Sequence, residues 1–177
     1  MGNYQQLRSD RDKKLDRVYQ QTDRVLAQYN KFILQPIVLY IAPNSEGGAI
    51  DPAKLQELMT YFDTYLQNTL GAKYEIVNTP GPGVAQLRVA LTDVKLGNTV
   101  MSVIPVSRVA GAGLGGASFE AEMFDSVSRV RIAAVVDSSS GKRFGSVGLD
   151  PLDNAKYVFR FWIDDLVRRI DRAQLSR

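Results

Sequence analysis

Two stretches of the chain repeat apolar residues every three or four positions, as one buried face of a helix requires. Each begins with Asp-Pro, at residues 51–52 and 150–151, where the aspartate can cap free N–H groups and the proline fits the first helical position. The pattern predicts two main helices, over residues 51–70 and 151–172. Their apolar positions are Leu55, Leu58, Met59, Phe62 and Leu66 in the first, and Leu152, Ala155, Phe159, Trp162, Ile163, Leu166 and Ile170 in the second.

Other stretches have the pattern of strands. Residues 31–41 (KFILQPIVLYI) are apolar and β-branched, which is typical of a buried strand, and Pro36 forces a bulge or an edge position. Residues 84–94 alternate between apolar and polar side chains, so this strand has one face toward the core and one toward solvent. We expect the first strand, the first helix and the residues KYEIVNT after it to form a βαβ unit.

A hairpin is expected later in the chain. Residues 118–124 (SFEAEMF) turn three apolar side chains toward the core and Glu120 and Glu122 toward solvent. The residues DSVSR form the turn, and VRIAAVVD returns as the next strand. With the turn centred between residues 126 and 127, Glu122 falls opposite Arg131 on the outer face, where the two charges attract each other.

The order of these elements predicts an α/β (α+β) sandwich, with a mixed, largely antiparallel sheet and the two main helices packed on it. Residues 1–30 are polar and weakly patterned, so we expect an N-terminal arm or tether with one helical turn near DRVLAQY. Residues 31–177 then form a single α/β domain, because a chain of 177 residues is long enough for one substantial core and too short for two ordinary ones.

Composition removes several kinds of chemistry. The sequence contains no cysteine and no histidine, which excludes zinc sites built from thiolate or imidazole, cysteine nucleophiles, and Ser-His or Cys-His dyads. Catalysis would have to rely on carboxylates, lysine, tyrosine or serine. We therefore expect no catalytic residues, no metal site, no cofactor and no enzymatic activity. No apolar run approaches the roughly 18 residues that span a bilayer.

The net charge of +3 is unevenly distributed. Residues 1–31 carry seven Lys/Arg against four Asp, and residues 151–177 carry six against four. Basic ends could face a polyanion. The charges alternate in sign, however, as in RSDRDKKLDR, and alternation is more typical of a solvated face. Nucleic acid is therefore not an expected partner.

Two glycine-containing stretches resemble nucleotide motifs. Gly111, Gly113 and Gly116 have the spacing of a dinucleotide-binding loop, but that loop needs a helix after it to hold the pyrophosphate, and the residues after Gly116 have the alternation of a strand. The stretch SSSGKR fails the phosphate-loop pattern, which requires glycine where Val136 stands and Ser or Thr where Arg143 stands. We expect no nucleotide at either place.

Five carboxylates are candidates for an acid–base pair. A pair within roughly 5 to 10 Å across a cleft would suit glycan hydrolysis. A structural role is favoured, because aspartate is common at strand ends, where its side chain bonds the turn backbone, and no nucleophile or metal motif accompanies these residues. The five are Asp93, Glu120, Glu122, Asp125 and Asp137.

The apolar run VMSVIPV stands between glycine-rich stretches. Packing into the core is its favoured fate, because buried apolar side chains are the default. If the protein binds a partner, the loop over residues 97–117 is the better candidate for the contact. Its contact residues would be Val100, Met101, Val103, Ile104, Val106 and Arg108.

Most of the chain, from about Tyr29 to the last helix, resembles a bacterial lipoprotein family of unknown function, domain of unknown function 3313 (DUF3313). The most specific stretches are PGPGVAQLRVALTDV and GGASFEAEMFDS. The resemblance implies a secreted precursor with a lipobox cysteine, whose acylated N-terminus anchors the protein to the outer membrane and leaves the domain in the periplasm. This sequence contains no such cysteine, and the family brings no known activity or functional residues.

Three functions remain open. The favoured one is a non-catalytic periplasmic domain of an outer-membrane lipoprotein that binds another envelope protein or a cell-wall polymer, peptidoglycan. The first alternative is a carboxylate-dependent glycan hydrolase. The second is a domain that holds a small apolar ligand between sheet and helices, which requires a cavity of roughly 300 Å³ or more. The oligomeric state is open.

Overall fold

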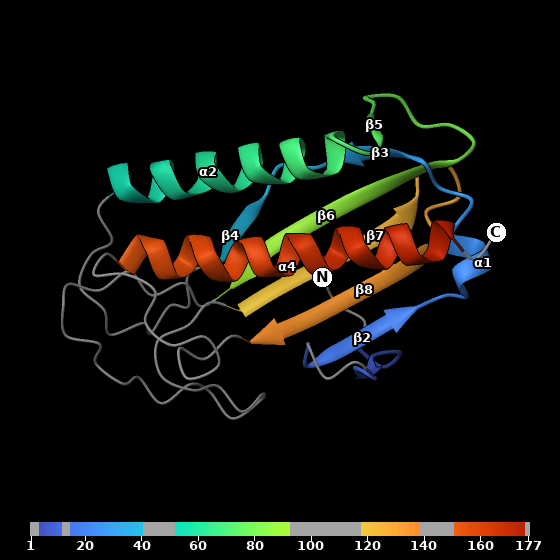
Figure 1. Cartoon of the computed structure of the whole chain (residues 1–177), viewed down its shortest axis with the longest axis horizontal. Helices are drawn as coiled ribbons and strands as arrows, with labels where there is room; N and C mark the ends of the chain where they lie inside the picture. Colours follow the sequence, from blue (N-terminus) through green and yellow to red (C-terminus); the bar gives the residue numbers. More distant parts are fainter. Residues whose placement is uncertain (1–3, 12–14, 41–51, 93–117, 139–150, 176–177) are drawn as a thin grey trace.

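A computed structural model of the chain describes residues 4–11, 15–40, 52–92, 118–138 and 151–175. These residues form two layers (Figure 1). One layer is a sheet of eight strands, and the other consists of α2 and α4, which lie side by side on one face of that sheet. The predicted fold class, a mixed and largely antiparallel sheet with two main helices packed on it, is confirmed.

The sheet is open and runs in the order β1-β2-β8-β7-β6-β3-β5, with β4 also paired to β6. From β1 through β2, β8 and β7 to β6, each strand is antiparallel to the next. Strand β3 pairs in parallel with both β6 and β5, and β4 pairs in parallel with β6. The pairing of β3 with β5 across α2 gives the expected βαβ unit. The strands are β1 (Arg8–Ser9), β2 (Arg17–Gln20), β3 (Lys31–Leu34), β4 (Val38–Tyr40), β5 (Glu75–Ile76), β6 (Val84–Thr92), β7 (Ser118–Asp125) and β8 (Arg131–Ser138).

The predicted strand over residues 31–41 is divided into β3 and β4. Pro36 lies between the two parts and is exposed, and it has no N–H group to donate to a neighbouring strand. Both parts pair with β6, so the chain continues along the same neighbour after the interruption. The expected irregularity at Pro36 is therefore present.

The helices are α1 (Asp23–Leu26), α2 (Pro52–Gly71) and α4 (Pro151–Gln174). The two long ones match the predicted spans closely, and α2 buries Leu58, Phe62, Leu66 and Leu70. Phe62 stacks on Phe159 of α4, with ring centroids 4.0 Å apart. Aromatic contacts of this kind hold the two helices together over the sheet.

The N-terminal segment differs from the expected arm. It contributes β2, which pairs with β8 over four residues, and β1, which pairs with β2. Leu15 and Leu26 are buried in the main core, and α1 is the helical turn predicted near DRVLAQY. Residue 30 is therefore not a boundary of the sheet. The burial of Leu15 and Leu26 was not predicted, because both stand in a mainly polar segment without a clear periodic pattern of apolar residues.

The side chains expected to point into solvent on β6 and β7 are less exposed than alternation predicts. Gln86 is 7% and Glu122 is 8% exposed. The hairpin pairs Phe124 with Arg131, and a register shift between Met123 and Phe124 adds one further residue, so Glu122 lies opposite Ala134 rather than Arg131. The expected ion pair nevertheless forms on the diagonal, with Arg131 Nη1 3.2 Å from Glu122 Oε1.

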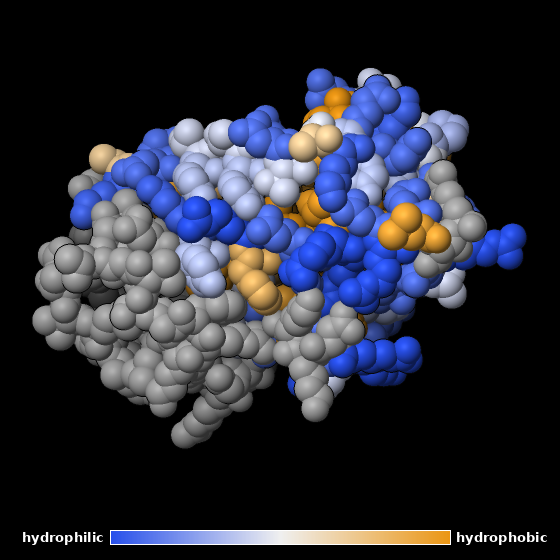
Figure 2. Space-filling model, viewed as in Figure 1, coloured by the Kyte–Doolittle hydropathy of each residue, from blue (hydrophilic) through white to orange (hydrophobic). Residues whose placement is uncertain are grey.

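Among the described residues no helix is both long enough and apolar enough to cross a membrane. The apolar surface of α4 is turned toward the sheet, where Phe159, Trp162, Ile163 and Ile170 are buried. The polar residues of α2 and α4 dominate the surface of the layer that they form, as Figure 2 shows.

Candidate functional site

The sheet has one face that neither long helix covers, here called the helix-free face. Phe119 of β7 stacks on Trp162 of α4 with ring centroids 4.7 Å apart, which identifies the opposite, helix-bearing face. Leu91 lies opposite Phe119 and shares that face. Because side chains alternate along a strand, every second residue of β6 and β7, starting next to Leu91 and Phe119, points to the helix-free face. On β6 and β7 they include Gln86, Arg88, Ala90, Glu120, Glu122 and Phe124.

Exposed apolar residues of β4 extend this face. Val38 and Tyr40 lie opposite Ala90 and Thr92 of β6, and they are 45% and 55% exposed. Within the described part of the chain β4 pairs only with β6, so its outer edge presents unpaired backbone groups. An exposed edge strand with apolar side chains is a place where another chain can pair.

Two arginines of the helix-free face lie over aromatic rings. The guanidinium of Arg88 is 5.0 Å from the centroid of Phe124, and that of Arg131 is 5.3 Å from the centroid of Tyr19. Arg131 also donates to Gln6 at 2.7 Å and pairs with Glu122. Cation–π attraction helps to hold each guanidinium over its ring.

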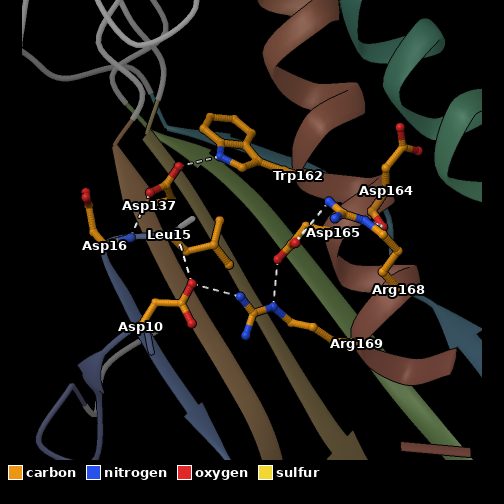
Figure 3. A network of polar contacts seen from close by, with 9 residues as sticks. All are labelled: Asp10, Leu15, Asp16, Asp137, Trp162, Asp164, Asp165, Arg168 and Arg169. Atoms are coloured by element: carbon orange, nitrogen blue, oxygen red, sulfur yellow. Dashed lines mark hydrogen bonds and ion pairs between the residues drawn. The ribbon is translucent and has the colours of Figure 1, made fainter. Parts of the chain in front are cut away.

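A second polar cluster lies on the helix-bearing side and joins the N-terminal segment to α4 (Figure 3). Arg169 donates through Nε to Asp165 at 2.6 Å and through Nη2 to Asp10 at 2.9 Å. Arg168 pairs with the other oxygen of Asp165 at 3.0 Å. The Asp10 carboxylate also accepts the N–H of Leu15 at 3.1 Å. Two arginines thus balance two aspartates that are both nearly inaccessible to water.

Burial and charge act in opposite directions on Arg169. Burial alone would lower the pKa of its guanidinium, but the carboxylates of Asp165 and Asp10 outweigh it and raise that pKa. Arg169 therefore stays charged. Such a fully paired cluster suits a structural role, which is to hold the N-terminal segment against α4.

Asp137 completes this connection. It is fully buried, and its carboxylate accepts the indole N–H of Trp162 at 2.6 Å and the backbone N–H of Asp16 at 2.8 Å. Asp16 in turn accepts the N–H and O–H of Ser138. These bonds tie β2, β8 and α4 together at one end of the sheet.

The four candidate carboxylates that the structure describes do not converge. Asp137 points to the helix-bearing face, whereas Glu120 and Glu122 point to the helix-free face. Asp125 accepts the backbone N–H of Ser128 at 2.6 Å in the hairpin turn and the O–H of Tyr29 at 3.1 Å. The turn N–H is the main cause that lowers the pKa of Asp125. Asp93 lies outside the described residues.

A narrow apolar cavity lies between α4 and strands β2, β8, β7 and β6. Its volume is about 40 Å³, and its walls include Leu15, Val18, Met123, Leu166 and Arg169. A pocket for a small molecule has roughly 300 to 1,000 Å³. The space beneath α4 in the described chain is thus far too small for the apolar ligand of the second alternative. No group of three or more carboxylates among the described residues is placed to hold a metal ion.

Several sequence candidates fall outside the described residues. They include the six contact residues expected in the loop over residues 97–117, namely Val100, Met101, Val103, Ile104, Val106 and Arg108, and the glycines of residues 111–116. The chain that follows, from Ser118, is a strand, as the alternation predicted. A dinucleotide loop would need a helix there.

Two polar contacts of the structure could not be predicted from the sequence. Asp10 stands in a stretch of alternating charge, typical of a solvated face, yet it is 6% exposed. Arg129 stands in the turn between β7 and β8 and reaches β6, where it donates to Gln86 Oε1. Its backbone has a φ of 62°, a conformation uncommon for a residue other than glycine. Neither contact produces a pattern of residues at fixed spacing that the sequence would reveal.

The fold and its polar clusters define a mixed α/β domain with a one-sided helical layer. A family model described as "Protein of unknown function (DUF3313)" matches residues 1–166. The chain belongs to this family, and the predicted family membership is confirmed. A search for curated relatives found no match.

A comparison with solved structures found several that resemble this chain. A single-residue variant of the PelC dodecamer from Paraburkholderia phytofirmans is 14% identical, with a TM-score of 0.48, over 86% of this chain and 95% of that one. The PelC dodecamer itself is 13% identical, with a TM-score of 0.46 and the same coverage. A Xanthomonas campestris protein of family DUF330 is 10% identical, with a TM-score of 0.44, over 82% of this chain and 87% of that one.

Proposed function

We propose that the chain is a non-catalytic domain of the bacterial cell envelope that binds an envelope protein or a cell-wall polymer through its helix-free face. The observation that carries this proposal is the edge strand β4, with Val38 and Tyr40 exposed beside an unpaired backbone edge in the described chain. An extended segment of a partner could add to this edge by main-chain hydrogen bonds, and the two exposed side chains would give it specificity.

The described carboxylates support a binding role over hydrolysis. Glu122 is engaged by Arg131, Glu120 accepts the O–H of Tyr4 at 3.0 Å, and Asp125 is engaged by its own turn. A hydrolase needs one carboxylate free to donate a proton and another free to attack or to activate water. Carboxylates with these protein partners, on two faces of a sheet, are poorly suited to that task.

The location of the domain is the second part of the proposal. The family resemblance implies a precursor with an acylated cysteine, which would place the domain on the periplasmic side of the outer membrane. Growing the source bacterium with an alkyne-labelled fatty acid should label the full-length protein, and the label should disappear when the precursor's acylation cysteine is replaced by serine. A full-length protein that carries no label would contradict the lipid anchor but would not test the proposed binding face.

Binding is tested with purified protein and isolated cell envelopes. We expect the wild-type chain to sediment with envelopes in a saturable manner, and Val38→Asp and Tyr40→Asp to abolish this, because each places a charge on the exposed edge strand. The matched control is Leu175→Asp, which introduces the same charge at a side chain that is 88% exposed outside the sheet. Equal binding by all four proteins would refute the proposed face.

A further inference from the structure

A pair of arginines on the helix-free face is held over one pair of neighbouring side chains. Gln86 of β6 and Phe124 of β7 lie directly opposite each other. The guanidinium of Arg88 lies over the Phe124 ring, and the guanidinium of Arg129 donates to Gln86 Oε1. Two cations from separate parts of the chain are therefore brought to the same place.

Neither of these charges is balanced by a carboxylate in the described chain. Arg131 pairs with Glu122, and Glu120 binds Tyr4, so the two acidic residues of the face already have partners. Arg88 and Arg129 are both exposed, and neither has an ion pair with a described residue. Two neighbouring positive charges repel each other, and an anion placed between them relieves that repulsion.

The donors around this position match an oxyanion. Each guanidinium presents a planar set of N–H donors that fits the oxygens of a phosphoryl group in pairs. Gln86 is 7% exposed, and with its Oε1 accepting from Arg129 its amide nitrogen is left as a further donor on the same spot. Its Nε2 has no acceptor among the residues that the structure describes.

The backbone at Arg129 has a conformation that favours glycine over arginine. Its φ of 62° lies in the left-handed region, which glycine occupies without strain, and this position in a hairpin turn is one where glycine is common. An arginine there carries a backbone cost that its side chain has to offset. The contact with Gln86, beside Arg88, is what the strained position makes possible.

We infer that Arg88, Arg129 and Gln86 form a binding site for a phosphoryl oxyanion, carried either by a membrane lipid headgroup or by a soluble phosphorylated molecule. The inference deepens the proposed function, because it rests on the same helix-free face and names the chemistry which that face recognises. The site lies on β6 and the β7–β8 turn, and Arg88 is two positions along β6 from the residue opposite Val38. Separate substitutions test the two places, so the two can fail separately.

The site is tested on the purified chain with pyrophosphate as the soluble probe, by calorimetry at low ionic strength. We expect saturable binding of one pyrophosphate, weakened about tenfold or more by Arg88→Gln and by Arg129→Gly, since each removes one charge-assisted pair of bonds. Arg129→Gly also relieves the left-handed backbone, so its thermal midpoint should be unchanged or raised. A loss of binding in this variant therefore cannot be explained by unfolding.

The matched control is Arg160→Gln, which removes the same charge from an exposed position on α4. It should leave pyrophosphate binding within about twofold, because a distant exposed charge is screened by salt. Equal weakening by Arg160→Gln would show a general attraction to a basic protein and overturn the site. Absence of saturable binding by the wild-type chain, with vesicles and pyrophosphate alike, would overturn it too.

Vesicles distinguish the two sources of phosphate. Sedimentation with vesicles that contain phosphatidylglycerol, but not with pure phosphatidylcholine, and its loss in Arg88→Gln and Arg129→Gly, would identify the lipid headgroup. Binding of pyrophosphate without binding to either vesicle would identify a soluble phosphorylated molecule. If envelope binding depends on Val38 and Tyr40 while the wild-type chain binds neither pyrophosphate nor phosphatidylglycerol vesicles, the oxyanion site is refuted and the proposed function stands.

Discussion

Replacing Arg169 by methionine should lower the free energy of unfolding by about 3–5 kcal/mol, the range for breaking a buried ion pair from one side. The side chains of Asp10 and Asp165 are 2% and 3% exposed, and that of Arg169 is 18% exposed. Methionine keeps most of the aliphatic packing and removes the charge, so two buried carboxylates lose the guanidinium that bridges them. Asp165 keeps Arg168, whereas Asp10 loses its bond to α4, so the cost falls mainly on Asp10.

Urea unfolding followed by the fluorescence of Trp162 measures this loss, because Trp162 is the only tryptophan and is 2% exposed beside the cluster. Arg168→Met is the neighbouring control: its side chain is 48% exposed, so its pair with Asp165 should contribute only about 0–1 kcal/mol. A double-mutant cycle of Arg169→Met with Asp10→Asn should give a coupling of about 1–3 kcal/mol. Equal costs for the two arginine variants, or no coupling with Asp10, would refute the view that this cluster fastens the N-terminal segment to α4.

Three further outcomes follow from other contacts. Phe159→Ala should cost about 3–5 kcal/mol in urea unfolding, because Phe159 is fully buried against Phe62; a cost under about 1 kcal/mol would contradict the helix packing. Asp125 has a lowered pKa in the folded state, chiefly through the N–H of Ser128, so its stabilisation is present above its unfolded pKa of about 4 and is lost as the pH falls through the folded value. Asp125→Asn should therefore be less stable than wild type near neutral pH and lose less stability on acidification, and an unchanged acid slope would contradict this. Burial and the bond to Asp125 raise the pKa of Tyr29 to about 12; its stabilisation is complete below its unfolded pKa of about 10 and declines as the pH rises toward the folded value, so Tyr29→Phe should flatten alkaline unfolding followed by circular dichroism.

The helices and strands that were predicted correctly are those with a periodic pattern of apolar residues. The stripes that begin after Asp51 and Asp150 place α2 and α4 to within a few residues, because a helix that buries one face must repeat apolar residues at its own period. The alternation of residues 84–94 and 118–124 likewise identifies β6 and β7. Pro36 marks the interruption between β3 and β4 because proline cannot donate to a ladder.

Contacts between distant parts of the chain could not be predicted in this way. Asp10 meets Arg169 across 159 residues, and Arg131 meets Gln6 across 125. Such pairs depend on how strands are ordered in the sheet, which a single sequence does not encode in local spacing. The same holds for the register of the hairpin, in which Arg131 pairs with Phe124 instead of Glu122 and a shift between Met123 and Phe124 adds one residue to β8.

The arginine pair of the helix-free face was missed for a related reason. Arg88 is a regular outward residue of a strand, and Arg129 is one residue of a short polar turn, so neither is unusual alone. Their significance comes from the positions of Gln86 and Phe124, which only the pairing of β6 with β7 brings together.

The central claim, that the helix-free face binds an envelope partner, is tested most directly by site-specific photo-cross-linking in the living bacterium. The photoreactive residue is placed at Tyr40 on β4 or at Arg88 on β6, and for comparison at Glu57 on α2 or Arg160 on α4, all of them exposed. The account predicts reproducible adducts of one mass from positions 40 and 88 and none from positions 57 and 160. Adducts from the helix positions alone would place the partner on the other layer and contradict it.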